Sequence, residues 1–172
     1  MSVTRVLTMA DAEPLAALLR ANWDFLAPWM PARADEFFTV ARQGEILARE
    51  LDAYAREVMI PLAIVDADGE LAGRITISGI TRGAFQSASI GYWVAKSRNG
   101  RGLASAAVGE VIGIAFRDLG LHRLQAETLL HNTASQRVLR RNGFQPFAVA
   151  PSYLKIAGEW QDHLLFQLLN GA

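Results

Sequence analysis

Hydrophobic residues in the first third of the chain recur at helical spacing. After a short apolar stretch at residues 5–7, which predicts a strand, Thr8 and Asp11 form an approximate capping box. A helix is therefore predicted to start at Thr8, and a second one is predicted between residues 34 and 59. The apolar positions that carry the two helices lie mostly three or four residues apart: Leu15, Leu18 and Leu19 in the first, and Leu47, Leu51, Tyr54 and Val58 in the second.

The middle of the chain changes to alternating or continuous apolar runs, which are typical of β-strands. Residues 62–65 and 71–80 flank the turn sequence at residues 66–70 and are predicted to form a hairpin. A third strand is predicted over residues 88–95, after a connection at residues 83–86.

The next segment has the order strand, tight turn, helix, strand. A glycine-rich turn at residues 99–102 precedes a helix predicted over residues 103–119, which Gly120 can end, and residues 123–130 then predict a strand. This order predicts a right-handed crossover that joins two parallel strands.

The last forty or so residues predict a short helix, opened by Asn132 and closed by Gly143, and two strands at residues 152–156 and 163–169. Because hairpins stand on both sides of the crossover, the sheet is expected to be mixed. Without repeats or linkers, residues 1–172 are predicted to form one α/β (or α+β) domain.

Composition excludes several classes of protein. Hydrophobic residues make up 51% of the 172 residues and charged residues 20%, so a folded core is expected instead of disorder. Lys+Arg and Asp+Glu both number 17, so the basic surplus typical of nucleic-acid binding is missing. The chain has no cysteine, its three histidines match no metal-site spacing, and no apolar run reaches the roughly 20 residues that span a bilayer. We expect a cytoplasmic protein without a metal, a membrane partner or direct contact with nucleic acid.

The turn from Asn99 to Ser105 has the features of a phosphate-binding loop. Its glycines let backbone N–H groups approach an anion at the positive end of a helix, and Arg98 and Arg101 add positive charge. A glycine-rich connection that only turns the chain is the alternative. The Lys-Ser/Thr pair of a P-loop is missing, and a dinucleotide-binding fingerprint fits only in part.

Two motifs resemble the acetyl-CoA signature of the GNAT superfamily of N-acetyltransferases. Residues 91–95 and 99–104 resemble its Gln/Arg-x-x-Gly-x-Gly/Ala motif, with Asn99 where Gln or Arg is usual. Residues 132–135 and 142–144 resemble its second half. The resemblance implies a GNAT-like domain with a mixed central sheet that is splayed at the cofactor site and carries helices on both faces.

The branch is narrowed by the opening and the tail of the chain. Residues 7–12, 22–31, 122–124 and 153–163 resemble the Rim-type enzymes that acetylate the N-termini of ribosomal proteins. The resemblance implies an acetyl-CoA-dependent N-acetyltransferase, a monomer or homodimer, in which a protein α-amine attacks the thioester directly in a ternary complex. A small amine as acceptor, with the aromatic cluster at residues 23–29 lining a closed pocket, is one alternative, and a non-catalytic acyl-CoA-binding module is another.

Cofactor-binding residues follow from the same resemblance. The pantetheine arm is expected beside a strand, the pyrophosphate on the glycine-rich turn, and a family asparagine in contact with the cofactor. Ordinary sheet packing for the aromatic residues and a plain helix N-cap for the asparagine are the alternatives. The residues concerned are Tyr92, Trp93 and Val94 on the strand, Gly100, Arg101, Gly102, Leu103, Ala104 and Ser105 on the turn, and Asn132.

Glu127 is the candidate general base, because relatives with a glutamate at this offset are thought to use it so. A strand alternates its faces, so Glu127 shares one side with Gln125 and Leu129. A surface ion pair is the alternative role.

The candidate general acid is less sharply defined. Several relatives place a tyrosine seven residues after the motif asparagine, but that position here is Leu139. Ser135 on the short helix and Tyr153 in the tail remain as candidates.

Overall fold

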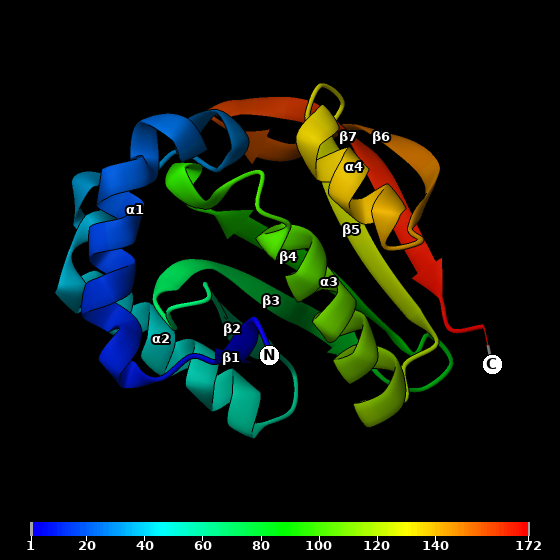
Figure 1. Cartoon of the computed structure of the whole chain (residues 1–172). Helices are drawn as coiled ribbons and strands as arrows, with labels where there is room; N and C mark the ends of the chain where they lie inside the picture. Colours follow the sequence, from blue (N-terminus) through cyan, green and yellow to red (C-terminus); the bar gives the residue numbers. More distant parts are fainter. Residues whose placement is uncertain (1, 172) are drawn as a thin grey trace.

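The computed structural model describes residues 2–171 as helices packed around a seven-stranded sheet with the order β1-β2-β3-β4-β5-β7-β6 (Figure 1). Strands β4 and β5 are parallel, and all other neighbours are antiparallel. The predicted mixed sheet, the hairpin around residues 66–70 and the parallel crossover are confirmed. The strands are β1 (Thr4–Val6), β2 (Ile60–Val65), β3 (Leu71–Thr81), β4 (Ser87–Val94), β5 (Arg123–Leu129), β6 (Gln145–Ile156) and β7 (Glu159–Leu169).

Within residues 2–171, four α-helices accompany the sheet: α1 (Ala12–Leu26), α2 (Val40–Ala55), α3 (Leu103–Gly113) and α4 (Thr133–Arg141). The predicted capping box is present, since the Thr8 N–H donates to the Asp11 carboxylate at 2.7 Å, but the first turn, Met9–Asp11, is a 3₁₀-helix. Within residues 2–171, no helix is long and apolar enough to cross a bilayer.

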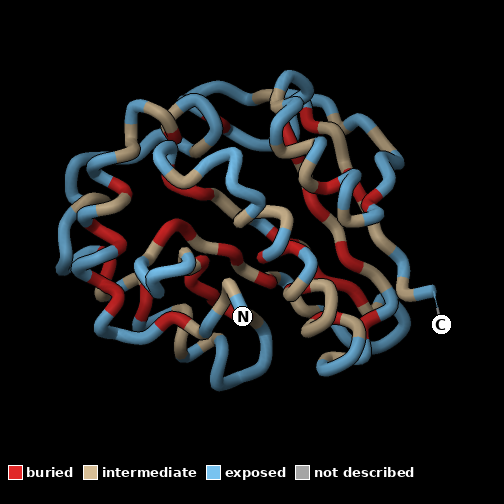
Figure 2. Tube along the Cα trace, viewed as in Figure 1, coloured by how far each residue is buried: buried red, intermediate tan, exposed pale blue. Residues whose placement is uncertain are grey.

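The helices cover both faces of the sheet, as predicted. One core cluster joins α1 and α2 to the sheet through residues such as Leu15, Leu47 and Ala63, and the other joins α3 and α4 to it through Val108 and Leu139. Figure 2 shows the buried positions along the strands and on the inward sides of these helices.

The segment between α1 and α2 contrasts with this core. It contains two short 3₁₀-helices, Ala27–Trp29 and Asp35–Phe38, and none of residues 27–39 is buried. The segment at residues 27–39 therefore lies on the surface of the molecule.

Three predicted boundaries were wrong, and in one of them β7 begins at Glu159 and not at residue 163. β6 begins at Gln145 and not at residue 152, because Pro146 and Pro151 disguise a strand that pairs only with β7 and can tolerate missing N–H donors. The helix predicted over residues 103–119 is α-helical only to Gly113 and continues as a π-helical turn, Ile114–Asp118.

The centre of the sheet is open on one side. β4 and β5 pair only through Ser87–Ser89 of β4 and Arg123–Gln125 of β5. Beyond Ser89 and Gln125 the two strands diverge, so residues 90–94 of β4 keep an edge that is not paired with β5. This confirms the predicted splay.

Candidate active site

A cavity of about 680 Å³, here called the central cleft, opens where the sheet splays. It receives side chains from β4, from the turn before α3, from the first residues of α3 and from α4. Nine of the ten residues predicted to bind the cofactor line it, and Arg101 alone does not: the nine are Tyr92, Trp93, Val94, Gly100, Gly102, Leu103, Ala104, Ser105 and Asn132.

The glycine-rich turn has the backbone that its sequence demands. Gly100 and Gly102 have φ values of 75° and 81°, a region that L side chains rarely adopt, and a Cβ on either would meet no atom within 4 Å. Gly102 is the N-cap of α3, so the free N–H groups of the first turn of this helix face the open side of the turn. Such a helix start, with its dipole, suits a phosphate.

Cationic side chains border the cleft on two sides. Arg98 forms an ion pair with Asp66 of the β2–β3 turn at 2.9 Å, so its charge is partly compensated. Arg137 and Arg141 line the cleft from α4, and neither was anticipated from the sequence. The signal was available, since Ala134, Arg137, Val138 and Arg141 have the i, i+3, i+4, i+7 spacing of one helix face.

The aromatic cluster at residues 23–29, which the sequence linked to the acceptor, contributes to the central cleft only in part. Phe25, Leu26 and Trp29, at the end of α1 and just after it, line the central cleft. Trp29 lies 5.4 Å from the His131 ring, centroid to centroid, whereas Trp23 packs on Phe38 at 4.9 Å. The aromatic residues at positions 23–29 therefore divide between two places and do not form a single closed pocket.

A pair of hydroxyl groups bridges the open part of the sheet. The Tyr92 hydroxyl lies 2.9 Å from Ser135 Oγ on α4 and also donates to the Ser135 carbonyl at 3.3 Å. Burial raises the pKa of Tyr92 to about 12, although the bond to Ser135 acts in the opposite direction. Both hydroxyls are therefore neutral near pH 7 and can pass a proton along the bond.

Both ends of α4 are fixed by side chains of the second predicted motif. Asn132 Oδ1 accepts from the Ser135 N–H at 3.1 Å, so Asn132 is an N-cap, and its Nδ2 remains as a donor beside the cleft. At the other end, Asn142 Nδ2 donates to Ser105 Oγ at 3.1 Å and so ties α4 to the first turn of α3. The two halves of the predicted signature thus meet at the cleft.

Glu127 lies on the other face of the sheet from the helices α3 and α4. Leu124 and Ala126 of β5 point into the core beneath these helices, so alternation turns Glu127 the opposite way. Ser89 pairs with Gln125, so Gly91, two residues beyond Ser89, shares the face of Glu127. Glu127 is not among the residues that line the central cleft.

The Glu127 carboxylate is half-buried without a partner. Among residues 2–171 it makes no hydrogen bond and no ion pair, so the ion pair considered as its alternative role is not formed. Burial raises the pKa of Glu127. An unpartnered carboxylate with a raised pKa beside the open part of the sheet is typical of a functional group.

The other two acid positions lie apart from the cleft. Leu139 is 1% exposed in the core beneath α4. Tyr153 is 43% exposed on β6, next to a break in its register with β7, and its ring lies 5.7 Å from that of His163. Ser135 is the only one of the three that the fold brings to the cleft.

The known proteins that are similar to this chain include several N-acetyltransferases. The family described as "Acetyltransferase (GNAT) domain" matches residues 3–145. The chain is 35% identical over 167 residues to a probable N-acetyltransferase, YjcK, of Bacillus subtilis, covering 96% of this chain and 92% of the relative. It is 30% identical to the [ribosomal protein uS5]-alanine N-acetyltransferase of Escherichia coli, covering 96% and 86%. The structure of Mycobacterium smegmatis RimJ in complex with CoA-disulfide superimposes with a TM-score of 0.92 at 34% identity, covering 96% of this chain and 80% of that one.

Proposed function

The chain belongs to the GNAT acetyltransferase family, and on this premise we propose that it moves the acetyl group of acetyl-CoA to the N-terminal α-amine of a protein. The amine attacks the thioester directly in a ternary complex, and residues 1–172 act as one catalytic domain. The observation that carries the proposal is the open sheet, with the glycine turn and the Ser135–Tyr92 pair on one face and unpartnered Glu127 on the other. Relatives named as ribosomal-protein alanine acetyltransferases support the choice of acceptor.

The central cleft fits acetyl-CoA by its donors and charges. The N–H groups from Gly100 to Ser105 suit the pyrophosphate. Arg137 and Arg141 in the cleft, and Arg101 in the same turn, supply positive charge. The edge of β4 at residues 90–94 offers backbone groups to the amides of the pantetheine arm, much as a sheet edge pairs with an added strand. Bound there, acetyl-CoA supplies the thioester carbon that the amine attacks.

The protein groups then handle two protons. Glu127 accepts a proton from the attacking amine, directly or through one water, because it lies on the face opposite α3 and α4, beside the point where β4 and β5 stop pairing. Ser135 Oγ gives a proton to the departing thiolate and recovers one through the Tyr92 hydroxyl. Because the chain has no cysteine, no acyl-cysteine intermediate forms.

An α-amine suits this modest machinery better than a lysine side chain. With a pKa of about 7.7–8.0, roughly a tenth of an α-amine is neutral at pH 7, whereas a lysine of pKa about 10.4 is almost wholly charged. We therefore expect short peptides to be acetylated at their N-terminus, with a small first residue such as Ala or Ser.

The test uses the purified full chain, acetyl-CoA and three acceptor sets. These are peptides with a free N-terminus, the same peptides blocked at the N-terminus but carrying a lysine, and small polyamines and amino sugars. Mass spectrometry is expected to find acetyl groups on the free N-termini. Products confined to lysines or to small amines would overturn the choice of acceptor, and no turnover of any acceptor would favour a non-catalytic acyl-CoA-binding module.

A further inference from the structure

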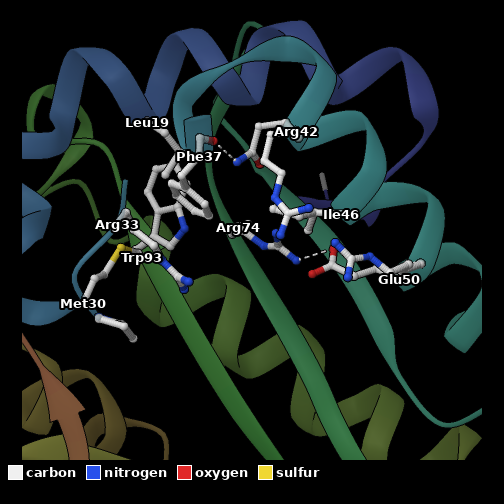
Figure 3. A pocket seen from close by; sticks show the side chains of 12 residues that line it. Leu19, Met30, Arg33, Phe37, Arg42, Ile46, Glu50, Arg74 and Trp93 are labelled. Carbon is white, nitrogen blue, oxygen red and sulfur yellow. Dashed lines mark hydrogen bonds and ion pairs between the residues drawn. The ribbon is translucent and has the colours of Figure 1, made fainter. Parts of the chain in front are cut away.

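A second cavity, of about 510 Å³, lies on the face of the sheet that carries α1 and α2 (Figure 3). Four arginines line it from three separate parts of the chain: Arg33 from the segment after α1, Arg42 and Arg49 from α2, and Arg74 from β3. We call this cavity the arginine pocket. Its apolar walls include Trp93 and Phe37.

The arginine pocket adjoins the central cleft through Trp93. This residue on β4 lines both cavities, and Trp29 lines the cleft while the next residue, Met30, lines the pocket. Alternation along β4 places Trp93 on the same face as Gly91, and therefore on the face of Glu127. The pocket thus lies on the side from which an acceptor amine reaches Glu127.

Positive charge in the pocket exceeds negative charge. Glu50, the one carboxylate that lines the pocket, forms an ion pair with Arg74 at 2.8 Å. Both side chains are mostly buried, with 18% of Glu50 and 16% of Arg74 exposed. Arg42 is paired at the rim with Glu45 at 2.6 Å. Among residues 2–171, no carboxylate forms an ion pair with Arg33 or Arg49. Since the chain as a whole is neutral, this surplus is a local feature.

The arginines stand on a supported framework. The Arg33 guanidinium lies 4.5 Å from the centroid of the Phe37 ring, and the carbonyl of Phe37 accepts from buried Gln43 Nε2 at 2.6 Å. On the other side, the Ala157 N–H of the β6–β7 turn donates to the Met30 carbonyl at 2.9 Å. Figure 3 shows Arg42 and Arg74 close together near Glu50, and Arg33 beside Trp93 on the other side of the cavity.

We propose that the arginine pocket binds a carboxylate of the acceptor, carried by an acidic residue close behind the N-terminal amine. The inference rests on the proposed function and specifies its substrate class. Guanidinium groups hold carboxylates through paired hydrogen bonds, and the half-enclosed, partly apolar setting strengthens such bonds relative to water. Holding this carboxylate fixes the peptide so that its amine reaches the cleft past Trp93.

The test compares peptides that begin with Ala and differ only in one residue, Asp, Asn or Lys, at position two or three. For the wild-type protein we expect kcat/KM for the Asp peptide to exceed that for the Asn peptide by about tenfold, through KM, with the Lys peptide poorest. The double variant Arg33→Gln/Arg49→Gln removes the two unpaired charges and should erase this order. Arg56→Gln, near the end of α2 and outside the pocket, is the matched control and should keep it.

The outcomes separate this inference from the proposed function. Equal kcat/KM for the Asp, Asn and Lys peptides would overturn the role of the pocket while leaving N-terminal acetylation intact. If only small amines are acetylated, the proposed function fails, and an amino acid and its amide are then compared. If the wild type prefers the amino acid to its amide and the double variant does not, the arginine pocket binds the carboxylate of a small acceptor. If the wild type shows no such preference, the proposed carboxylate site is overturned.

Discussion

Replacing Glu127 by glutamine is expected to make the protein more stable and less active at once. The carboxylate is half-buried, has no hydrogen-bond or ion-pair partner in the described chain, and burial raises its pKa. Ionising it in the folded protein therefore opposes folding. Glutamine keeps the size of the side chain and removes the charge. The variant therefore loses both this cost to folding and the proposed proton acceptor.

The stability gain has a defined dependence on pH. Below the unfolded pKa, about 4.3, the carboxyl group is protonated in both states and the two proteins differ little. The folded pKa of Glu127 is raised, so the folded protein favours the protonated carboxyl group. The stability of the wild type therefore falls as the pH rises through this folded pKa. The Tm advantage of Glu127→Gln is thus expected to be small near pH 4 and to grow to a plateau at neutral pH.

The size of the activity loss depends on the neutral fraction of the acceptor amine as well as on the missing base. General bases contribute about 10²–10⁴-fold, and a partly neutral α-amine places Glu127→Gln at the low end, about 10²-fold in kcat at pH 7. Between pH 7 and pH 9 the neutral fraction of an α-amine rises from about 0.1 to about 0.9, so the deficit should shrink about tenfold.

The assay measures CoA release with saturating acetyl-CoA and a peptide acceptor from pH 6.5 to 9, and Tm from pH 4 to 8. Glu70→Gln, on an exposed glutamate of the β2–β3 turn, is the matched control and should change neither quantity. A Glu127→Gln variant that keeps full activity at pH 6.5 would leave water as the proton acceptor. One that loses stability at neutral pH would show that the carboxylate has a structural partner.

Two further predictions concern the cofactor face. Gly102→Val and Gly69→Val force the same positive φ on valine, 81° and 82°, and each should lose about 1–3 kcal/mol of stability. In a thermal-shift assay, acetyl-CoA at 100 times its Kd should stabilise the wild type and Gly69→Val by about 2.7 kcal/mol and leave Gly102→Val unchanged. Equal shifts in both variants would contradict the phosphate-binding turn. Ser135→Ala and Tyr92→Phe should each lower kcat, with a double-mutant coupling of about 1 kcal/mol because they remove the same 2.9 Å bond. Additive losses in the kinetics of the four proteins would exclude the proposed proton path.

Local signals explain what could be predicted from the sequence. The short helix α4 was predictable because Asn132 caps its own first turn and Gly143, at φ 85°, ends it. The hairpin turn was predictable for the same reason, since Asp66 Oδ1 accepts from the N–H groups of Asp68 and Glu70. These bonds join residues within four positions of each other, so the sequence carries them directly.

The features that were missed depend on contacts between distant segments. The position of Tyr153 follows from two register breaks between β6 and β7, which no local pattern encodes. Trp29 lines the central cleft together with residues of β4 and α4, which lie far from it in the sequence. The arginine pocket assembles Arg33, Arg49 and Arg74 from three elements, and only the fold brings their charges together.

The exposed segment at residues 27–39 can change in sequence more freely than the elements that rest on the core. It supplies Met30, Arg33 and Phe37 to the arginine pocket, yet none of its residues is buried. The turn and helices around the central cleft rest on the buried core, so changes there disturb folding, whereas changes to the exposed side chains of residues 27–39 are expected to cost little stability as long as the backbone bonds to Gln43 and Ala157 stay. On the proposed function, duplicated copies of such a gene can diverge in their acceptor while they keep the same acetyl donor, and a designer who wants a new acceptor should randomise residues 27–39 first.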